Sequence, residues 1–171
     1  WIGQISSWFY VLCERYYTSL NMVKFLNVSV SSVSSGANVT VVEPCNLYEC
    51  SLADNVFVGP FVEIQRGVSI GEGTRIQSHS LICELVLIGQ DCFIGHGVVF
   101  INDTFECGSP ARGDKSKWKT TNVGNRVSIG SNATILPVQI CDDVVIGAGA
   151  VVTKSINEPG VYLGNPAVKQ K

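Results

Sequence analysis

Residues 50–100, CSLADNVFVGPFVEIQRGVSIGEGTRIQSHSLICELVLIGQDCFIGHGVVF, repeat one pattern every six residues. A large apolar side chain recurs at Leu52, Val58, Ile64, Ile70, Ile76, Ile82, Ile88, Ile94 and Phe100. A period of six fits neither the 3.6-residue helix nor the two-residue alternation of an ordinary strand. A small or β-branched residue stands two positions before each large one, so both series should face one interior. The pattern predicts an all-β chain folded as a parallel β-helix of hexapeptide repeats.

Such a repeat is stable only as a stack. One short strand cannot bury its apolar face until the next coil lies on it, about 4.8 Å further along the axis. The residue two positions after each large one is expected at a coil corner, where a side chain can meet solvent or ligand. These corner positions are mostly polar: Pro60, Arg66, Glu72, Ser78, Glu84, Gln90, His96 and Asn102.

The six-residue register has a ragged start and one long interruption. Upstream of the regular stretch, Thr40 and Asn46 fall where large apolar residues belong, which predicts one or two capping coils. After Phe100 the register stops, and it resumes at Val123. We therefore expect about 17 residues to be extruded as a loop within residues 101–122.

Residues 1–27 are predicted to be an extension outside the β-helix. The first part is rich in aromatic residues, shows no repeat and precedes the only methionine, Met22. Glu14 and Arg15 interrupt the apolar run that a signal peptide or membrane anchor needs. We interpret this segment as an extension that need not be native to the protein.

Residues 28–158 should form the β-helix domain, and residues 159–171 should form a C-terminal cap. The tail leaves the six-residue register, and Pro159 and Pro166 are expected to end strand pairing. A cap is needed because the open end of a β-helix would expose an unpaired sheet edge.

Composition indicates one globular domain: 171 residues, 46% of them hydrophobic and 15% charged. The net charge of −2, without a basic block, gives no reason to expect a nucleic-acid partner. The seven cysteines form no CxxC pair: Cys13, Cys45, Cys50, Cys83, Cys92, Cys107 and Cys141. We interpret them as reduced core thiols of a cytoplasmic protein without a metal site.

The chain has only two histidines, His79 and His96, and both are predicted near corners. They lie 17 residues apart, which predicts that they are neighbours on successive coils. Glycines flank His96 and would let a ligand approach the backbone, and imidazole can accept a proton near neutral pH. His96 is therefore a candidate proton acceptor and His79 a candidate sugar or nucleotide contact. The alternative for each is a structural or solvated corner residue.

Polar residues gather at and within the predicted loop. Asn102 and Asp103 open it, where they could form turns with their own backbone or orient a substrate amine. A basic cluster surrounds an aromatic residue further on: Arg112, Lys115, Lys117, Lys119 and Trp118. This cluster is either a solvated loop or a phosphate site with Trp118 as a packing surface. Since His96 and Asn102 are expected on different corners of one coil, they could share a site only across a subunit interface.

Five segments occur in the order IGHGVVFIND, ARGDKSKWK, VSIGSNATILP, VVIGAGAVVTK and YLGNPA. In this order they resemble the bacterial nucleotide-linked amino-sugar N-acetyltransferases of the hexapeptide-repeat superfamily, over about residues 55–168. The dTDP-3-amino-3,6-dideoxyhexose 3-N-acetyltransferases look most similar, followed by the UDP-linked 3-amino-glucuronate enzymes. The resemblance implies a left-handed β-helix of three strands and eighteen residues per coil. It also implies a homotrimer with active sites between subunits and acetyl-CoA along the later coils.

The implied reaction is acetyl transfer from acetyl-CoA to the 3-amino group of a dTDP-linked 3-amino-3,6-dideoxyhexose, for cell-surface polysaccharide or glycan biosynthesis. By this resemblance Asn102 positions the amine, Asp103 stabilises the site, and His96 or the departing CoA sulfur accepts the proton. Implied sugar-nucleotide contacts are His79, Arg112, Lys115, Lys117 and Trp118. Implied acetyl-CoA contacts, several of them through the backbone, are Ser131, Ala133, Ala148, Ala150, Lys154, Asn165 and Pro166.

Other functions stay open at this point. The sugar could be linked to UDP, and an O-acetyltransferase would need a proton-accepting histidine because a hydroxyl is a weak nucleophile. A γ-class carbonic anhydrase shares the fold but needs three histidines around zinc, whereas this chain has two. A non-catalytic β-helical scaffold subunit would have no use for a basic loop beside His96.

Overall fold

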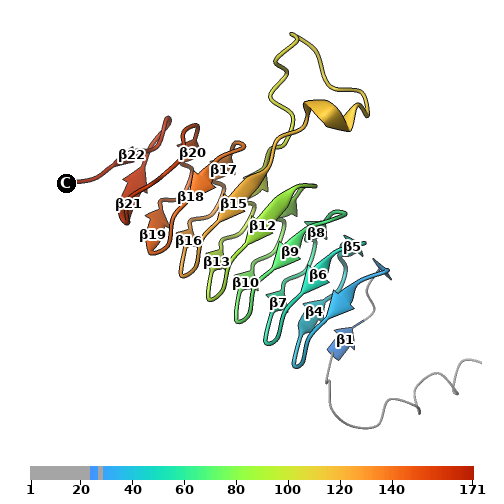
Figure 1. Cartoon of the computed structure of the whole chain (residues 1–171). Helices are drawn as coiled ribbons and strands as arrows, with labels where there is room; N and C mark the ends of the chain where they lie inside the picture. The colour runs from blue at the N-terminus through green and yellow to red at the C-terminus, as the bar shows by residue number, and fades with distance from the viewer. Residues whose placement is uncertain (1–23, 27–28) are drawn as a thin grey trace, which may run out of the picture.

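The computed structural model describes residues 24–26 and 29–171, and this part of the chain winds into a β-helix with three parallel sheets as its faces (Figure 1). The first sheet contains β1 (Lys24–Leu26), β4 (Thr40–Val42), β7 (Phe57–Val58), β10 (Arg75–Ile76), β13 (Phe93–Ile94), β16 (Ser128–Ile129), β19 (Val144–Ile146), β21 (Gly160–Leu163) and β22 (Val168–Lys169). The second contains β2 (Ser29–Ser31), β5 (Asn46–Tyr48), β8 (Glu63–Ile64), β11 (Leu81–Ile82), β14 (Val99–Phe100), β17 (Thr134–Ile135) and β20 (Val151–Val152). The third contains β3 (Ser34–Ser35), β6 (Ser51–Leu52), β9 (Ser69–Ile70), β12 (Val86–Ile88), β15 (Thr121–Val123) and β18 (Gln139–Ile140).

The core consists of the six-residue series that the sequence predicts. Ile76, Ile94 and Ile129 form one column in the first sheet, because their strands pair in register, and all three are fully buried. Even the polar residues of the small series are inward: Thr74 Oγ1 donates to the carbonyl of Gly89 at 2.8 Å. The predicted all-β parallel fold is confirmed, and the three-sheet hexapeptide coil is consistent with the predicted left-handed β-helix.

Each corner is a tight turn whose second residue commonly has positive φ, as in Phe61 (61°), His79 (65°) and Gly97 (65°). Backbone hydrogen bonds connect corners of successive coils: the N–H of His79 donates to Pro60 at 3.2 Å, and that of Gly97 donates to Ser78 at 2.9 Å. The corners therefore stack into three edges along the β-helix, which brings corner side chains of successive coils close together.

The expected capping coils at the start are regular coils with a displaced register. Val41 and Leu47 are buried, whereas Thr40 and Asn46 lie on the outer side of the strands. Leu52 follows Leu47 by five positions instead of six, so the inward series shifts by one position at this corner. The prediction that Thr40 and Asn46 mark a ragged cap was wrong because it assumed that the later register also held there. The first strand, β1, lies within the segment assigned to the extension and pairs with β4.

The C-terminal tail covers the end of the β-helix, but it does so with strands. β21 directly follows Pro159 and pairs in parallel with β19, and β22 pairs antiparallel with β21 (Figure 1). Ile156 bridges to Ile140 in the third sheet. Pro159 therefore does not end strand pairing, because the next residues provide the N–H groups that proline lacks. In the described part of the chain no helix is long and apolar enough to cross a membrane.

Candidate functional site

The edge between the first and second sheets carries both histidines, and we call the corner residues at positions 60–61, 78–79, 96–97, 131–132 and 148–149 the histidine edge. His96 is exposed on this edge. Its Nδ1 atom lies 2.8 Å from Oγ of Ser78, which occupies the corresponding corner position one coil earlier. One imidazole nitrogen is therefore held by the protein, and the other remains for a ligand.

His79 forms a second feature of the histidine edge, an aromatic pair with Phe61. The two rings stack with centroids 4.7 Å apart and an interplanar angle of 9°. Phe61 is 56% exposed, and both residues have positive φ, which is uncommon for aromatic residues. Positive φ is common at the corners of this β-helix, so it does not set the pair apart, but the exposed stacked rings are a candidate contact surface. The two histidines lie on successive coils, as predicted, but their rings have different partners: His96 contacts Ser78, and His79 stacks on Phe61.

Asn102 lies on the next edge, between the second and third sheets, as expected. Its side-chain Nδ2 donates to the carbonyl of Glu84 at 3.1 Å, and the N–H of Lys119 donates to the Asn102 carbonyl at 2.9 Å. These bonds close the root of the loop that leaves β14 and returns at β15. In one chain Asn102 and His96 are therefore on different edges, as the register predicts.

Asp103 holds the loop together. Its carboxylate accepts the N–H of Ala111 at 2.7 Å and the N–H of Phe105 at 3.0 Å. Chiefly the bond from Ala111, with that from Phe105 and the charge of Lys117, holds the pKa of Asp103 below its ordinary value. Of the two roles considered for Asp103, the structure displays the turn-forming one, and a contact with substrate stays a prediction.

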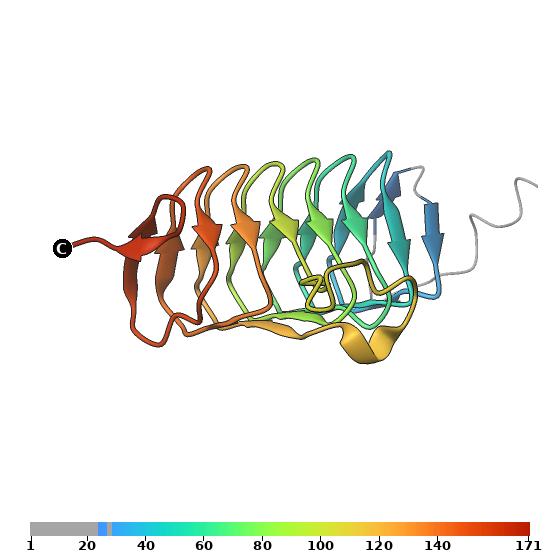
Figure 2. The same cartoon turned by 90° about the horizontal axis from the view of Figure 1, so that it is seen from above.

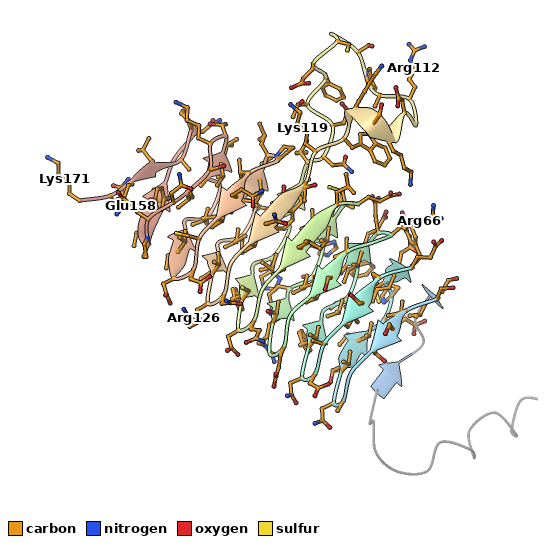
Figure 3. All side chains as sticks on the ribbon, viewed as in Figure 1. Arg66, Arg112, Lys119, Arg126, Glu158 and Lys171 are labelled. Atoms are coloured by element: carbon orange, nitrogen blue, oxygen red, sulfur yellow. The ribbon has the colours of Figure 1, made fainter. Side chains whose placement is uncertain are left out.

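Three of the four cations of the basic loop form ion pairs with nearby carboxylates. Lys115 pairs with Glu84 at 2.6 Å, Lys117 with Asp114 at 3.7 Å, and Lys119 with Glu106. Among the loop cations that the structure describes, Arg112 has no ion pair, and it points outward from the loop (Figure 3). Of the predicted phosphate contacts, Arg112 is thus the one whose charge needs no rearrangement to become available.

The loop, which includes the short 3-10 helix η2 (Lys115–Lys117), extends toward the earlier coils (Figure 2). Glu84 is the anchor for this arrangement, since it bonds both Asn102 through its carbonyl and Lys115 through its carboxylate. Trp118 is half-buried, and the Lys115 ammonium lies 5.4 Å from its ring centroid. Trp118 therefore belongs to the loop's own packing as well as to its candidate binding surface.

The candidate acetyl-CoA contacts divide into two groups. Ala133 and Ala150 are fully buried, and the backbone N–H and carbonyl groups of both bond within the β-helix. A backbone contact of either residue with acetyl-CoA stays a prediction. Ser131 is half-buried and Ala148 exposed, and both are on the histidine edge beyond His96. The other three predicted contacts are exposed near the C-terminal end: Lys154, Asn165 and Pro166.

Within residues 24–26 and 29–171 no cluster of three or more His, Cys, Asp or Glu residues could hold a metal ion. Four cysteines are buried core thiols: Cys45, Cys50, Cys83 and Cys92. Cys141 is partly buried, whereas Cys107 is exposed in the loop, so its interpretation as a core thiol was wrong. Cys13 lies outside the described residues.

Sequence reasoning did not single out Ser78, Phe61 or Glu84 as functional residues. Ser78 and His96 are 18 residues apart, and so are Phe61 and His79. A search for pairs at the full coil length of 18, rather than for pairs of the same residue type, would have found both contacts. Glu84 could not be found in this way, because its partners come from the loop.

Comparison with known proteins agrees with the repeat. Residues 49–84 match the family model described as bacterial transferase hexapeptide (six repeats), and residues 121–154 match the hexapeptide repeat of succinyl-transferase. The bifunctional protein GlmU of Streptococcus uberis (strain ATCC BAA-854 / 0140J) is 31% identical over 144 residues. This match covers 83% of the present chain but only 29% of that relative's length.

Two solved structures show the same fold. A variant of AntD, an N-acyltransferase from Bacillus cereus in complex with dTDP and coenzyme A, has a TM-score of 0.72 at 24% identity and covers 81% of this chain and 82% of its own. A variant of perosamine N-acetyltransferase from Caulobacter crescentus, in complex with CoA and GDP-perosamine, has a TM-score of 0.59 at 22% identity, with 84% and 53% covered. The repeats of this chain are thus similar to those of the hexapeptide-repeat transferases, and its fold is that of the two solved structures.

Proposed function

We propose that the protein transfers an acetyl group from acetyl-CoA to the 3-amino group of a dTDP-linked 3-amino-3,6-dideoxyhexose. The observation that carries the proposal is His96, an exposed imidazole held at one nitrogen by Ser78, on an edge that continues into the small corner residues Ser131 and Ala148. The nucleotide and CoA bound in the AntD structure support this substrate class. The perosamine N-acetyltransferase structure contains GDP-perosamine, so a sugar linked to another nucleotide is the alternative substrate.

The chemistry needs a neutral amine, a placed thioester and a proton acceptor. The amine nitrogen attacks the thioester carbonyl carbon, the C–S bond breaks, and the amine loses a proton to His96 or to the departing CoA sulfur. Positioning can supply much of the rate, because a neutral amine is already a good nucleophile. In this proposal the Asn102 amide orients the amine, and Arg112 meets a phosphate. The exposed face of the Phe61–His79 pair offers a stacking surface for the nucleobase.

We further propose that the site forms between subunits of a homotrimer. His96 and Asn102 lie on different edges of one coil, so the two side chains cannot meet within one chain. A neighbouring chain could bring its Asn102 edge to the histidine edge of the first. This arrangement gives three equivalent sites.

A thiol-release assay tests the function directly. Acetyl-CoA would be incubated with the protein and with dTDP-, UDP- and GDP-linked sugars that carry a 3-amine or a 4-amine, and CoA release would be followed with a thiol reagent. We expect the dTDP-linked 3-amino sugar to give the highest kcat/KM. Release with none of the sugars would refute the proposed function, and a preference for another nucleotide would correct the substrate.

Two variants test the interface. Asn102→Ala and His96→Gln should each reduce turnover, and co-expressed chains should regenerate some complete sites in mixed trimers. Recovered activity is expected because each mixed interface has either both residues intact or neither. Absence of rescue in trimers shown to be mixed would contradict a site shared by two subunits.

A further inference from the structure

We infer that Ser78 is a positioning residue that sets the tautomer of His96: its hydroxyl accepts the Nδ1–H, which leaves Nε2 unprotonated. This inference rests on the proposed function, in which His96 accepts a proton from the substrate amine. It starts from the 2.8 Å contact between Ser78 Oγ and His96 Nδ1.

The backbone fixes both residues on the histidine edge. The N–H of Gly97 donates to the Ser78 carbonyl at 2.9 Å, and the N–H of Asn132 donates to the His96 carbonyl at 2.8 Å. His96 is thus tied to the coil before it and to the coil after it. The hydroxyl of Ser78 meets the ring from a half-buried position, so it can hold one ring orientation while the rest of the imidazole stays exposed.

The direction of the hydrogen bond decides what His96 can do. A neutral imidazole has one N–H, and the bond made at one nitrogen determines which nitrogen carries it. If Ser78 donated to Nδ1, the hydrogen would be on Nε2, and neither nitrogen could take a proton from a substrate. If Nδ1–H donates to Ser78, the lone pair of Nε2 is free.

The hydrogen bond from His96 Nδ1–H to Ser78 Oγ can also remain in place after His96 has accepted a proton. An imidazolium has N–H groups on both nitrogens, so Ser78 can then only accept from Nδ1. A contact that already has this direction needs no reorientation during the reaction, and preorganised partners of this kind lower the cost of charge formation. The hydroxyl hydrogen of Ser78 remains free to rotate toward another acceptor.

A serine bonded to a histidine is also the geometry of a nucleophile and its base. In that alternative, Ser78 Oγ would attack the thioester carbon, the C–S bond would break, the CoA thiolate would take up the serine proton through His96, and acetyl-serine would remain. Direct attack by the amine needs no such intermediate. The two roles differ in whether the protein becomes acetylated.

Nitrogen-15 NMR of the imidazoles tests the tautomer without any substrate. The chain has two histidines, so a His79→Gln variant assigns the His96 signals. At a pH where the ring is neutral, we expect Nδ1 of His96 to carry the proton in the wild type and in Ser78→Thr, which keeps the hydroxyl. Ser78→Ala should shift the ring toward the Nε2–H form that free histidine prefers. A wild-type ring already in the Nε2–H form would overturn the inference.

Kinetics separates positioning from a merely structural role. Ser78→Ala should lower kcat about 10-fold, which is the effect of losing a hydrogen bond to a charged group, and should leave KM nearly unchanged. His96→Gln should remove one limb of the pH profile of kcat, and Ser78→Ala should change the same limb. Ser78→Thr should restore the profile, and Ser69→Ala, an exposed serine of the third sheet, should match the wild type. An unchanged profile in Ser78→Ala, or acetylation of Ser78 in the intact-protein mass, would overturn the positioning role. Absence of turnover in the wild type would instead refute the proposed function and leave the NMR result standing.

Discussion

Two adjacent residues of β12, Leu87 and Ile88, provide a matched test of the inward register. Both are aliphatic side chains of equal carbon number, and they point to opposite sides of the third sheet. Leu87 is 44% exposed, whereas Ile88 is 4% exposed and pairs in register with Ile70 and Val123. The change to alanine at each position therefore removes similar atoms from different environments.

The structure predicts a clear difference in the free energy of unfolding. Truncation of a buried isoleucine to alanine costs about 2–5 kcal/mol, because it loses burial and leaves a cavity. Leu87 already has nearly half of its surface in water, so Leu87→Ala should cost about 1 kcal/mol. At about 2–4 °C per kcal/mol for a chain of this size, Ile88→Ala should lower Tm by roughly 4–20 °C and Leu87→Ala by roughly 2–4 °C.

Thermal and urea unfolding of both variants would be measured at two protein concentrations. A loss caused by Ile88→Ala should be large at both concentrations, because the cavity lies inside one chain. If Leu87 packed against another subunit, its loss would grow on dilution, which separates an interface from a core. Equal and concentration-independent losses for the two variants would refute the assignment of Ile88 to the interior.

Three further outcomes can be checked separately. Gly71→Ala should destabilise the β-helix, because a Cβ there would lie 2.4 Å from the carbonyl carbon of Gly89; an unchanged Tm would show that the coils are not packed this closely. Burial raises the pKa of the Cys83 thiol to about 12, so a thiol reagent should label it slowly. The exposed Cys107 should be labelled rapidly, and Cys107→Ser should remove this fast label from the intact-protein mass. The hydrogen bond from Arg126 holds the pKa of Asp143 in the folded protein below its ordinary value. The carboxylate therefore stabilises the fold at any pH above the ordinary pKa, and this stabilisation is lost as the pH falls through the lower pKa of the folded state. Asp143→Asn should flatten the acid side of a curve of Tm against pH.

The regular coils could be predicted from the sequence because one physical requirement repeats in each of them. A buried residue such as Ile64 must be apolar, so the period is visible without any knowledge of its neighbours. The prediction failed at Thr40 and Asn46 because the corner after them, between Leu47 and Leu52, is one residue shorter. A shortened corner leaves every backbone hydrogen bond possible, but it changes which residues face inward, and no local feature of the sequence marks it.

The sequence predicted where the candidate site residues lie on the β-helix better than it predicted which side chains they contact. The register placed His96 and Asn102 on different edges correctly, because corner positions follow from the inward series. It did not indicate that Lys115 would pair with Glu84, since a loop bond to an earlier coil depends on the loop's own path. A phosphate site in the basic loop stays a prediction. Ion pairs with Glu84 of an earlier coil and with Asp114 and Glu106 of the loop engage three of the loop's four cations.

The histidine edge also explains how one scaffold can change its chemistry without changing its fold. Its coils are joined by backbone bonds, such as that from Gly97 to Ser78, and by side-chain contacts such as that of Ser78 with His96. Successive coils repeat at about 4.8 Å, and they set an aromatic pair, a bonded histidine and small residues in a line. A substitution at Phe61 should then alter ligand affinity while leaving Tm nearly unchanged, whereas one at an inward isoleucine should do the reverse. If both outcomes are observed, stability and ligand binding depend on different positions of the same six-residue repeat.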